Sequence, residues 1–405
     1  MRSWVAAALV GASISSIALG ACATPNPEVR EVAAAQTTVA AASKVPAAMT
    51  TASSANTAAA PRISVKDGAS GVKPWEGVKV ASRSKLLEVT MTNEEGREVD
   101  SKFSSDKTEW ATAEPLGYGR TYTLKAKNAD GKTSTSTFTT FAPEQQANVS
   151  VGPLEGSTVG IGQAVTFRFS APVKDRAAVE KKITVETSND TVGGFFWLDP
   201  YELRWRPKDF WEPGTEVNVA AELYGRDLGG GVWGANDVTI DFTIGDAVTA
   251  VVDNATKTLT VYRGEEAPKT FPVALGIDGK FDTPNGTYVI GDSHEKLVMD
   301  SRSYGLGLDQ GGYVTPVDFA TQMSYSGIYV HSAPWAASAW GNTNVSHGCI
   351  NASYEDARWF QQTVRRGDPV IVKNTQGKDL SPYDGLGYWN FSWSKRSGGP
   401  DDPHA

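Results

Sequence analysis

Two sets of residues recur 95 positions apart, and this repeat restricts the fold more than any other feature of the sequence. The matching residues are Trp110, Gly119 and Tyr122, followed by Trp205, Gly214 and Val217. Each set precedes a Phe-Thr pair, at Phe138-Thr139 and at Phe242-Thr243. Short alternating segments separated by Gly and Pro surround both sets, which is typical of antiparallel β-structure. The repeat predicts two related β-modules, at residues 62–145 and 148–245, each an immunoglobulin-like sandwich.

One hairpin in the first module can be read directly from the sequence. Residues 122–127 (YTLKAK) alternate apolar and polar side chains, Asp130-Gly131 supplies a turn, and residues 133–138 form a second run. An Asp-Gly pair between two such runs is a strong hairpin signal. We therefore expect these two runs to pair as antiparallel strands.

The first 22 residues have the features of a secretory signal peptide. A positive charge at Arg2 precedes an apolar run that starts at Trp4, and the segment ends in Leu-Gly-Ala followed by Cys22. Such a layout is typical of exported proteins. We expect Cys22 to be the lipidated first residue of a cell-membrane lipoprotein that faces the periplasm and cell wall. Ordinary signal-peptidase cleavage, with Cys22 incidental, is the alternative.

Composition describes the segment that follows and the class of partner. Residues 23–60 are rich in Ala, Thr, Ser and Pro, so they cannot bury enough apolar surface to fold alone, and we expect a disordered linker. The formal net charge of -8 argues against a nucleic-acid partner. Cys349 is the only cysteine beyond Cys22, so it has no disulfide partner within the folded part of the chain.

A third, β-rich domain is expected at residues 247–374. Residues 250–253 and 258–262 predict its first hairpin, and residues 283–288 (TPNGTY) predict a turn into a strand. Ser353 is placed as the N-cap of a short helix, with an acidic residue three positions on. That helix would carry Ala357, Phe360 and Val364 on one face, end at Gly367, and begin just after Cys349.

Residues 375–405 form a C-terminal extension to that domain. The stretch from Asp384 to Trp393 is too aromatic for a free end, so we expect it to pack on folded surface. Beyond Ser394 we expect disorder.

The chemistry of the chain is concentrated between His331 and Asn351. Fourteen residues separate His331 from the run Ser346-His347-Gly348-Cys349-Ile350-Asn351. A cysteine with a nearby imidazole can attack a carbonyl once the base takes its proton. Gly348 has no Cβ, so the backbone N–H groups of residues 348 and 349 could approach the resulting oxyanion. We therefore expect acyl transfer with Cys349 as nucleophile and His331 as general base.

This spacing and motif resemble the active-site signature of the L,D-transpeptidases, enzymes with a YkuD-type catalytic domain that cross-link peptidoglycan. Residues 324–335 (SYSGIYVHSAPW) resemble the mycobacterial and related actinobacterial members, as do the two β-modules, so the similarity covers residues 62–393. The resemblance implies a thioester on Cys349, release of D-Ala, and 3→3 cross-links between tetrapeptide stems that serve as donor and acceptor. It also implies acylation of Cys349 by carbapenems and no cofactor.

The same resemblance assigns roles to further residues. The backbone carbonyl of Ser332 would orient the imidazole. Tyr304, Tyr313 and Trp335 would line the donor pocket, with Tyr313 at the oxyanion. The remaining motif residues would fix the loop and support the acceptor side, namely Ser346, His347 and Asn351.

Several other interpretations remain open at this point. Water could resolve the same thioester, which would make an L,D-carboxypeptidase. The chain could instead be a non-catalytic wall-binding lipoprotein, or the two β-modules could be spacers, which we favour over wall binding. Sortases carry a Thr-Leu-x-Thr-Cys strand that this chain lacks, and papain-like hydrolases place Cys before His. A zinc site from His331, His347 and Cys349 has no evident fourth ligand, and His294 and His404 are expected at the surface.

Overall fold

The computed structural model describes residues 58–403, which belong to one compact unit. The expected signal peptide, the lipidated Cys22 and nearly all of the expected linker lie outside the described residues. Within the described part of the chain, no helix has both the length and the apolar character needed to cross a membrane.

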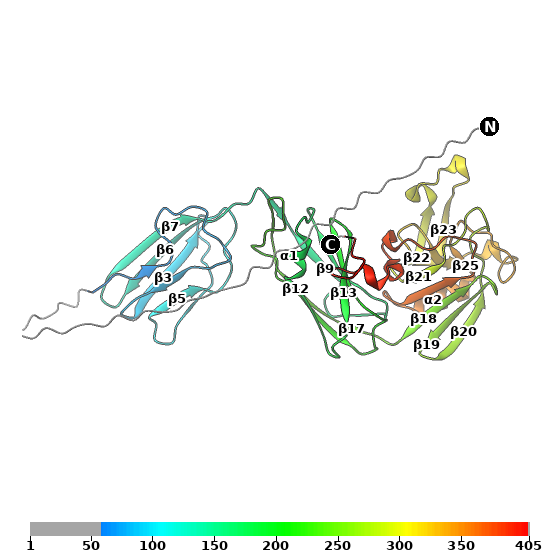
Figure 1. The fold of residues 1–405 in the computed structure, drawn as a ribbon, viewed down its shortest axis with the longest axis horizontal. Helices are drawn as coiled ribbons and strands as arrows, with labels where there is room; N and C mark the ends of the chain where they lie inside the picture. Colours follow the sequence, from blue (N-terminus) through cyan, green and yellow to red (C-terminus); the bar gives the residue numbers. More distant parts are fainter. Residues whose placement is uncertain (1–57, 404–405) are drawn as a thin grey trace, which may run out of the picture. The chain divides into compact units, whose positions relative to one another are not determined.

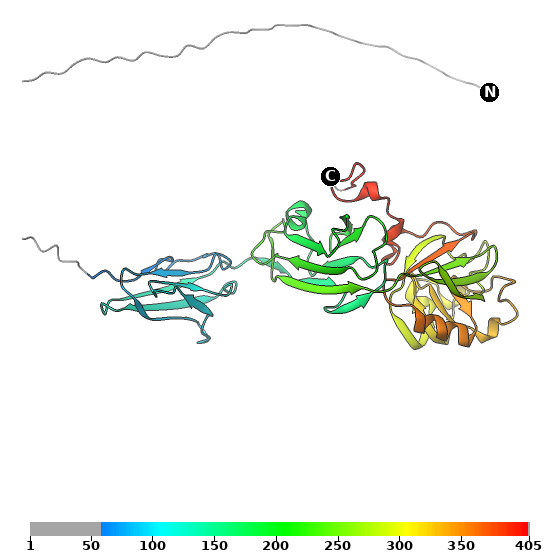
Figure 2. The same cartoon turned by 90° about the horizontal axis from the view of Figure 1, so that it is seen from below.

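The first module is a sandwich of two sheets, which Figure 2 shows as two layers in blue to cyan. One sheet has the order β1-β2-β5-β4 and the other the order β3-β6-β7. The strands are β1 (Arg62–Ile63), β2 (Lys79–Ala81), β3 (Leu86–Asn93), β4 (Ser101–Phe103), β5 (Glu109–Thr112), β6 (Thr121–Asn128) and β7 (Thr133–Thr139). The predicted hairpin is confirmed, because β6 pairs with β7 in antiparallel register. Trp110, Leu124 and Phe138 fill the space between the sheets.

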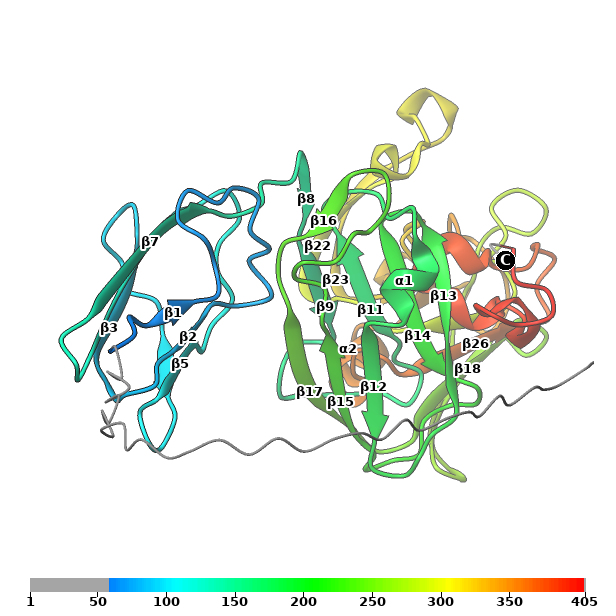
Figure 3. The same ribbon diagram turned by 60° about the vertical axis from the view of Figure 1, so that its left-hand side comes forward.

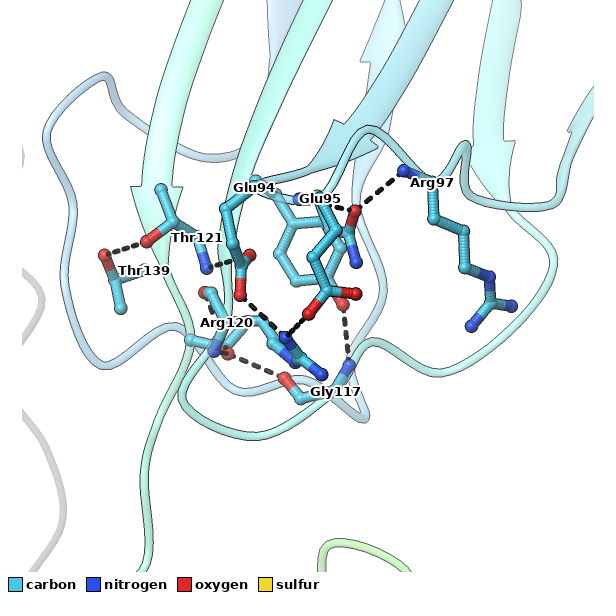
Figure 4. Close-up of polar contacts among 10 residues, drawn as sticks. Glu94, Glu95, Arg97, Gly117, Arg120, Thr121 and Thr139 are labelled. Carbon is cyan, nitrogen blue, oxygen red and sulfur yellow. Dashed lines mark hydrogen bonds and ion pairs between the residues drawn. The ribbon is translucent and has the colours of Figure 1, made fainter.

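A polar corner closes one end of this module (Figure 4). Arg120 Nη1 lies 2.9 Å from Glu94 Oε1 and 2.7 Å from Glu95 Oε1, and the Thr121 N–H donates to Glu94. The Arg120 guanidinium lowers the pKa of the Glu94 carboxyl. Exposed ion pairs add little stability. The main effect of these contacts is therefore to fix how the chain after β3 meets the start of β6.

The second module is also a sandwich, built from two four-stranded sheets. Its sheets have the orders β10-β17-β15-β12 and β13-β14-β11-β9, and Figure 3 shows β9, β11, β14 and β13 side by side. The strands are β8 (Gln145–Ala147), β9 (Val149–Gly152), β10 (Ser157–Val159), β11 (Val165–Phe169), β12 (Ile183–Thr187), β13 (Gly193–Asp199), β14 (Glu202–Pro207), β15 (Glu216–Ala221), β16 (Val232–Gly234) and β17 (Val238–Ile244). A short helix, α1 (Arg176–Glu180), precedes β12. The core of this second module contains Phe167, Leu203 and Phe242.

The 95-residue repeat has a structural counterpart in the two sandwiches. Trp110 on β5 and Trp205 on β14 are both buried. Gly119 and Gly214, which precede β6 and β15, have φ values of +60° and +79°. A residue with a Cβ is strained in this left-handed region. The repeat therefore records the same buried tryptophan and the same glycine corner in each module.

The third domain holds two further sheets and one longer helix (Figure 1). The sheets have the orders β20-β19-β18-β26-β21 and β22-β23-β24-β25, and α2 (Tyr354–Thr363) contacts β23 and β24. The strands are β18 (Val248–Asp253), β19 (Thr258–Arg263), β20 (Glu266–Pro272), β21 (Gly286–Val289), β22 (Ser293–Asp300), β23 (Val314–Gln322), β24 (Tyr329–Ser332), β25 (Ile350–Ala352) and β26 (Pro369–Lys373). The short 3-10 helices are η1 (Ser301–Tyr304), η2 (Leu308–Gln310), η3 (Pro334–Ala336), η4 (Pro382–Asp384), η5 (Tyr388–Asn390) and η6 (Trp393–Lys395).

The expected fold class, mainly β with two sandwiches ahead of a β-rich domain and a short helix, is confirmed by this architecture. The hairpin of β18 and β19 and the Ser353 N-cap are also as predicted, with Ser353 Oγ accepting from the Asp356 N–H. The predicted helix end is wrong. Helix α2 stops at Thr363, and Val364 is extended at φ -89°, ψ 159° but still buried. Val364 packs on the core without continuing the helix.

The C-terminal extension packs against the second module, as expected from its aromatic residues. Tyr388 Oη donates to the Gly162 carbonyl at 2.8 Å and accepts from the Ala164 N–H at 3.0 Å. The buried Arg206 guanidinium donates to the Phe391 carbonyl and lies 4.4 Å from the Trp389 ring centroid. Buried cations need such partners. The extension therefore connects the second module with the third domain.

The expected disorder beyond Ser394 is wrong for the residues that follow directly. The Ser397 N–H donates to the Phe195 carbonyl at 2.8 Å, and Ser397 Oγ donates to Glu180 at 2.8 Å. These contacts hold the chain end on β13 and α1 of the second module.

Asp368 lies where the second module meets the third domain, and its carboxyl is 1 % exposed. Gly160 and Gly162 of the second module donate N–H groups to the carbonyls of Arg366 and Gly367, next to this aspartate. Burial raises the pKa of Asp368 to about 7, although Oδ2 accepts from the Arg365 N–H and the Arg365 and Arg263 charges act in the opposite direction. The stability that this group contributes is present below its unfolded pKa and is lost as the pH rises through about 7.

We expect Asp368→Asn to remove this pH dependence, because the amide fills the same space without a charge. The melting temperature of the variant relative to the parent chain should rise between pH 5 and pH 8.5, as measured by differential scanning calorimetry. A temperature difference that is constant over that range would contradict the assignment.

Candidate active site

The pairing of β24 with β25 brings the expected nucleophile and base together. The two strands are parallel, with His331 opposite Asn351. Cys349 comes two residues before Asn351, directly ahead of β25. All three line one cavity of about 370 Å³.

The cavity is formed largely by residues that the sequence singled out. Those predicted residues are Tyr313, His331, Trp335, Ser346, His347, Cys349 and Asn351. Four further lining residues were missed, namely Met299, Thr315, Val317 and Val345. Three of these lie on β22 and β23, and only the alternation of those strands could have indicated them.

His331 is held as a neutral base. Its Nδ1 lies 2.9 Å from the Ser332 carbonyl oxygen, so Nδ1 carries the hydrogen and Nε2 keeps its lone pair. Burial lowers the pKa of His331, against a smaller opposite effect of this hydrogen bond. The Ser332 contact is the one that the resemblance implied. The Ser332 hydroxyl itself has no partner among the described residues.

The surroundings of Cys349 favour the protonated thiol. Burial raises its pKa to about 12, and the Tyr329 backbone acts less strongly in the opposite direction. The thiol donates to the Gly327 carbonyl at 3.5 Å. Across residues 58–403 no hydrogen bond joins Cys349 to His331. Helix α2 starts at Tyr354, and β25 lies between this helix and Cys349.

The loop before Cys349 is fixed by its own hydrogen bonds. Gly348 has φ +122° and donates its N–H to Ser346 Oγ at 3.0 Å. Ser346 Oγ in turn donates to the Cys349 carbonyl at 2.6 Å. The expected oxyanion hole is therefore incomplete here, because the Gly348 N–H already has an internal acceptor.

Thr283 is a residue whose contribution the sequence did not reveal. Its hydroxyl donates to the Gly348 carbonyl at 2.8 Å and accepts from the Gly276 N–H. The sequence TPNGTY was read only as a turn into a strand. Thr283 in this sequence also anchors the loop that carries the nucleophile.

His347 connects the motif with the segment that leads into β23. Its ring lies 4.3 Å from the Phe281 ring and 4.9 Å from the Tyr313 ring, centroid to centroid. Its Nε2 lies 2.9 Å from the Gly311 carbonyl oxygen, a donor contact in the matching tautomer. The imidazole thus contacts both Tyr313, which lines the cavity, and the backbone two residues before it.

Trp335 and Tyr304 were both expected to line the pocket, but only Trp335 does so. Trp335 lines the cavity with its ring 6.3 Å from the His331 ring, although 60 % of the residue is exposed. Tyr304 does not line it. Its ring lies beneath Gly327, and its hydroxyl is 3.4 Å from that of Tyr329. Tyr304 therefore supports the turn that accepts the thiol hydrogen.

Asn351 leaves an unused acceptor in the cavity. The residue is 3 % exposed, and its Oδ1 has no hydrogen-bond partner among the described residues. A buried carbonyl without a partner is costly unless a ligand satisfies it. Among residues 58–403 no group of three or more His, Cys, Asp or Glu side chains is placed to hold a metal ion.

Comparisons with known proteins agree with this geometry. Residues 247–372 match a family model for the L,D-transpeptidase catalytic domain, and residues 69–227 match one for a bacterial Ig domain. L,D-transpeptidase 2 of Mycobacterium tuberculosis (strain CDC 1551 / Oshkosh) is 45 % identical, covering 82 % of each chain. L,D-transpeptidase 5 of Mycobacterium tuberculosis (strain ATCC 25618 / H37Rv) is 33 % identical, covering 82 % of this chain and 76 % of the relative. A structure of LD transpeptidase LdtMt1 in complex with imipenem has a TM-score of 0.50 and 37 % identity, over 56 % of this chain and 99 % of that one.

We expect Ser346→Ala to lower the free energy of unfolding by about 1 to 3 kcal/mol, because one buried hydroxyl serves both the Gly348 N–H and the Cys349 carbonyl. Chemical denaturation would measure the loss. Ser392→Ala is the matched control, since Ser392 is exposed and its hydroxyl contacts only Ser394. Equal stability of the two variants would show that the hydroxyl does not hold the loop.

Proposed function

The chain belongs to the L,D-transpeptidase family, and from this premise we propose that it forms 3→3 cross-links between peptidoglycan stem peptides through a thioester on Cys349. One observation carries the proposal. His331 on β24 and Cys349, directly before the paired strand β25, line one cavity. The family supports the choice of substrate, and the geometry of the cavity supports the choice of catalytic residues.

In the first half-reaction, the Cys349 sulfur attacks the carbonyl carbon that links the L-centre of the third-position diamino acid to the terminal D-Ala. His331 Nε2 takes the thiol proton and passes it to the departing amine, so the amide bond breaks and D-Ala leaves. A thioester joins the donor stem to the sulfur.

In the second half-reaction, the side-chain amine of another stem attacks the thioester carbonyl. His331 takes a proton from this amine and returns it to the sulfur as the carbon–sulfur bond breaks. The product contains the 3→3 cross-link, and the enzyme regains its thiol. Water in place of the amine would give the L,D-carboxypeptidase outcome.

The protonation states at rest support a general-base mechanism. Burial raises the pKa of Cys349 and lowers that of His331, and both effects favour a neutral pair. The proton therefore moves as the sulfur attacks, and no ion pair has to exist beforehand. The same conditions suit the second step, which needs an uncharged imidazole to accept a proton from the amine.

Polar groups around the cavity would bind the reacting peptide. Burial raises the pKa of Tyr313, so its phenol keeps the hydrogen and can donate to the oxyanion. The free Oδ1 of Asn351 can accept an N–H from a stem peptide. The Gly348 N–H can join these groups only when Ser346 Oγ releases it.

We also propose that the enzyme acts at the cell envelope as a lipoprotein anchored through Cys22. The apolar segment and the Leu-Gly-Ala-Cys site of the sequence support this location. The linker of residues 23–60 would then let the folded unit reach wall material above the membrane.

We expect residues 58–405 to release D-Ala from a disaccharide-tetrapeptide that ends in meso-diaminopimelate and D-Ala, and to yield a cross-linked dimer. Mass spectrometry would follow both products. Cys349→Ala should abolish them while keeping its fold. Tripeptide without dimer would favour the carboxypeptidase, and unchanged substrate with folded protein would favour a non-catalytic wall-binding protein.

We expect imipenem to acylate Cys349, since the nucleophile that attacks a stem peptide can also open a β-lactam ring. Intact-mass spectrometry should show one added drug molecule in the parent chain and none in Cys349→Ala. Modification of both proteins to the same extent would place the reaction at another residue.

A further inference from the structure

The carbonyl that accepts the Cys349 thiol hydrogen belongs to a tight turn between β23 and β24. Ser324 Oγ accepts the Ile328 N–H at 2.9 Å across this turn, and Gly327 has φ +94°. Its carbonyl oxygen lies 3.5 Å from the Cys349 sulfur. This turn therefore supplies the hydrogen-bond acceptor of the thiol.

Asp384 of the C-terminal extension holds the turn from outside the domain. Its Oδ1 accepts the Tyr325 N–H at 2.9 Å, and its Oδ2 accepts the Ser326 N–H at 3.1 Å. Hydrogen bonds to a carboxylate are stronger than those between neutral groups. Two consecutive amides of the turn are thus fixed by one side chain that lies 59 and 58 residues away in the sequence.

Close packing on both sides restricts the turn further. The Tyr304 ring lies so close beneath Gly327 that a Cβ there would come within 2.6 Å of it. The Tyr325 ring lies against Gly385, where a Cβ would overlap it. The Tyr325 hydroxyl also accepts from Arg168 of the second module, at 3.3 Å. Asp384 is therefore part of a fitted contact between the extension and the turn.

We propose that Asp384 is a positioning residue for the nucleophile, because it fixes the turn whose Gly327 carbonyl orients the Cys349 thiol. Asp384 touches neither the sulfur nor the cavity lining. It lies outside residues 247–372, which match the catalytic-domain family model. The inference rests on the proposed role of Cys349 as nucleophile.

The hydrogen bond from the thiol to the Gly327 carbonyl determines whether a looser turn raises or lowers the pKa of Cys349. A carbonyl oxygen can accept a hydrogen from the thiol but only repels a thiolate, so the contact favours the protonated form. Loosening the turn should lower the pKa of Cys349 and let the sulfur adopt other rotamers. Acyl transfer should then slow, because small displacements of a reacting atom cost large factors in rate.

The test uses the full chain with Asp384→Asn, whose amide can accept only one of the two N–H groups. Iodoacetamide labelling would be followed between pH 6 and pH 10 at Cys349 by peptide mass spectrometry, which separates it from Cys22. We expect labelling at pH 8 to be about threefold to tenfold faster than in the parent chain. The kcat for D-Ala release should fall about tenfold while KM changes little, since the cavity lining is intact.

Two control variants separate this role from general loosening of the extension. Asp379→Asn makes the same change at an exposed carboxyl that has no side-chain hydrogen bond or ion pair among the described residues, and should behave as the parent chain. Asn390→Ala removes hydrogen bonds that tie the extension to Thr287 and leaves the turn untouched. It should lower the melting temperature without moving the labelling profile.

An Asp384→Asn profile that coincides with the parent profile, or that Asn390→Ala reproduces, would overturn the proposal. Labelling measures the thiol directly and needs no turnover. A parent chain that fails to release D-Ala would therefore count against the proposed function, and the labelling profile would still judge Asp384.

Discussion

The active site depends on the parallel pairing of β24 with β25. This pairing places His331 opposite Asn351, and Cys349, two residues earlier and directly ahead of β25, lines the same cavity. Parallel neighbours need a long connection between them. Here that connection is residues 333–349, which also carry Trp335 and the Ser346 loop. One backbone register thus fixes the base, the nucleophile and much of the wall of the cavity.

The sequence predicted the fold class and the pairing of Cys349 with His331, but it did not predict the surroundings of the thiol. The spacing from His331 to Cys349 and the neighbouring motif were enough to bring them together. The environment of the thiol was not predictable, because it depends on contacts from other segments of the chain. The Gly327 carbonyl accepts from the thiol, and the Thr283 hydroxyl donates to the neighbouring Gly348 carbonyl. Tyr304 was placed in the pocket by the family resemblance, but it does not line the cavity. Its position depends on how tightly it packs under Gly327, which spacing alone does not specify.

Predictions from neighbouring residues were reliable for structures that depend on the local backbone. They were weaker for structures that depend on packing between distant residues. The N-cap at Ser353 and the hairpin of β6 and β7 were as predicted, since each depends on neighbouring residues. The end of α2 was not, because Val364 remains buried after the backbone has turned to extended geometry. The ordered contacts of Ser397 were also missed. They depend on Phe195 and Glu180, which are about 200 residues earlier.

The way the extension joins the second module to the third domain also bears on how such chains can evolve. Arg206 from the second module, Tyr388 from the extension and Asp368 from the third domain are all buried where these parts meet. A recombination event that exchanged the third domain alone would leave these polar groups facing a surface that does not satisfy them. The second module, the third domain and the extension would therefore have to be exchanged together to keep these groups satisfied.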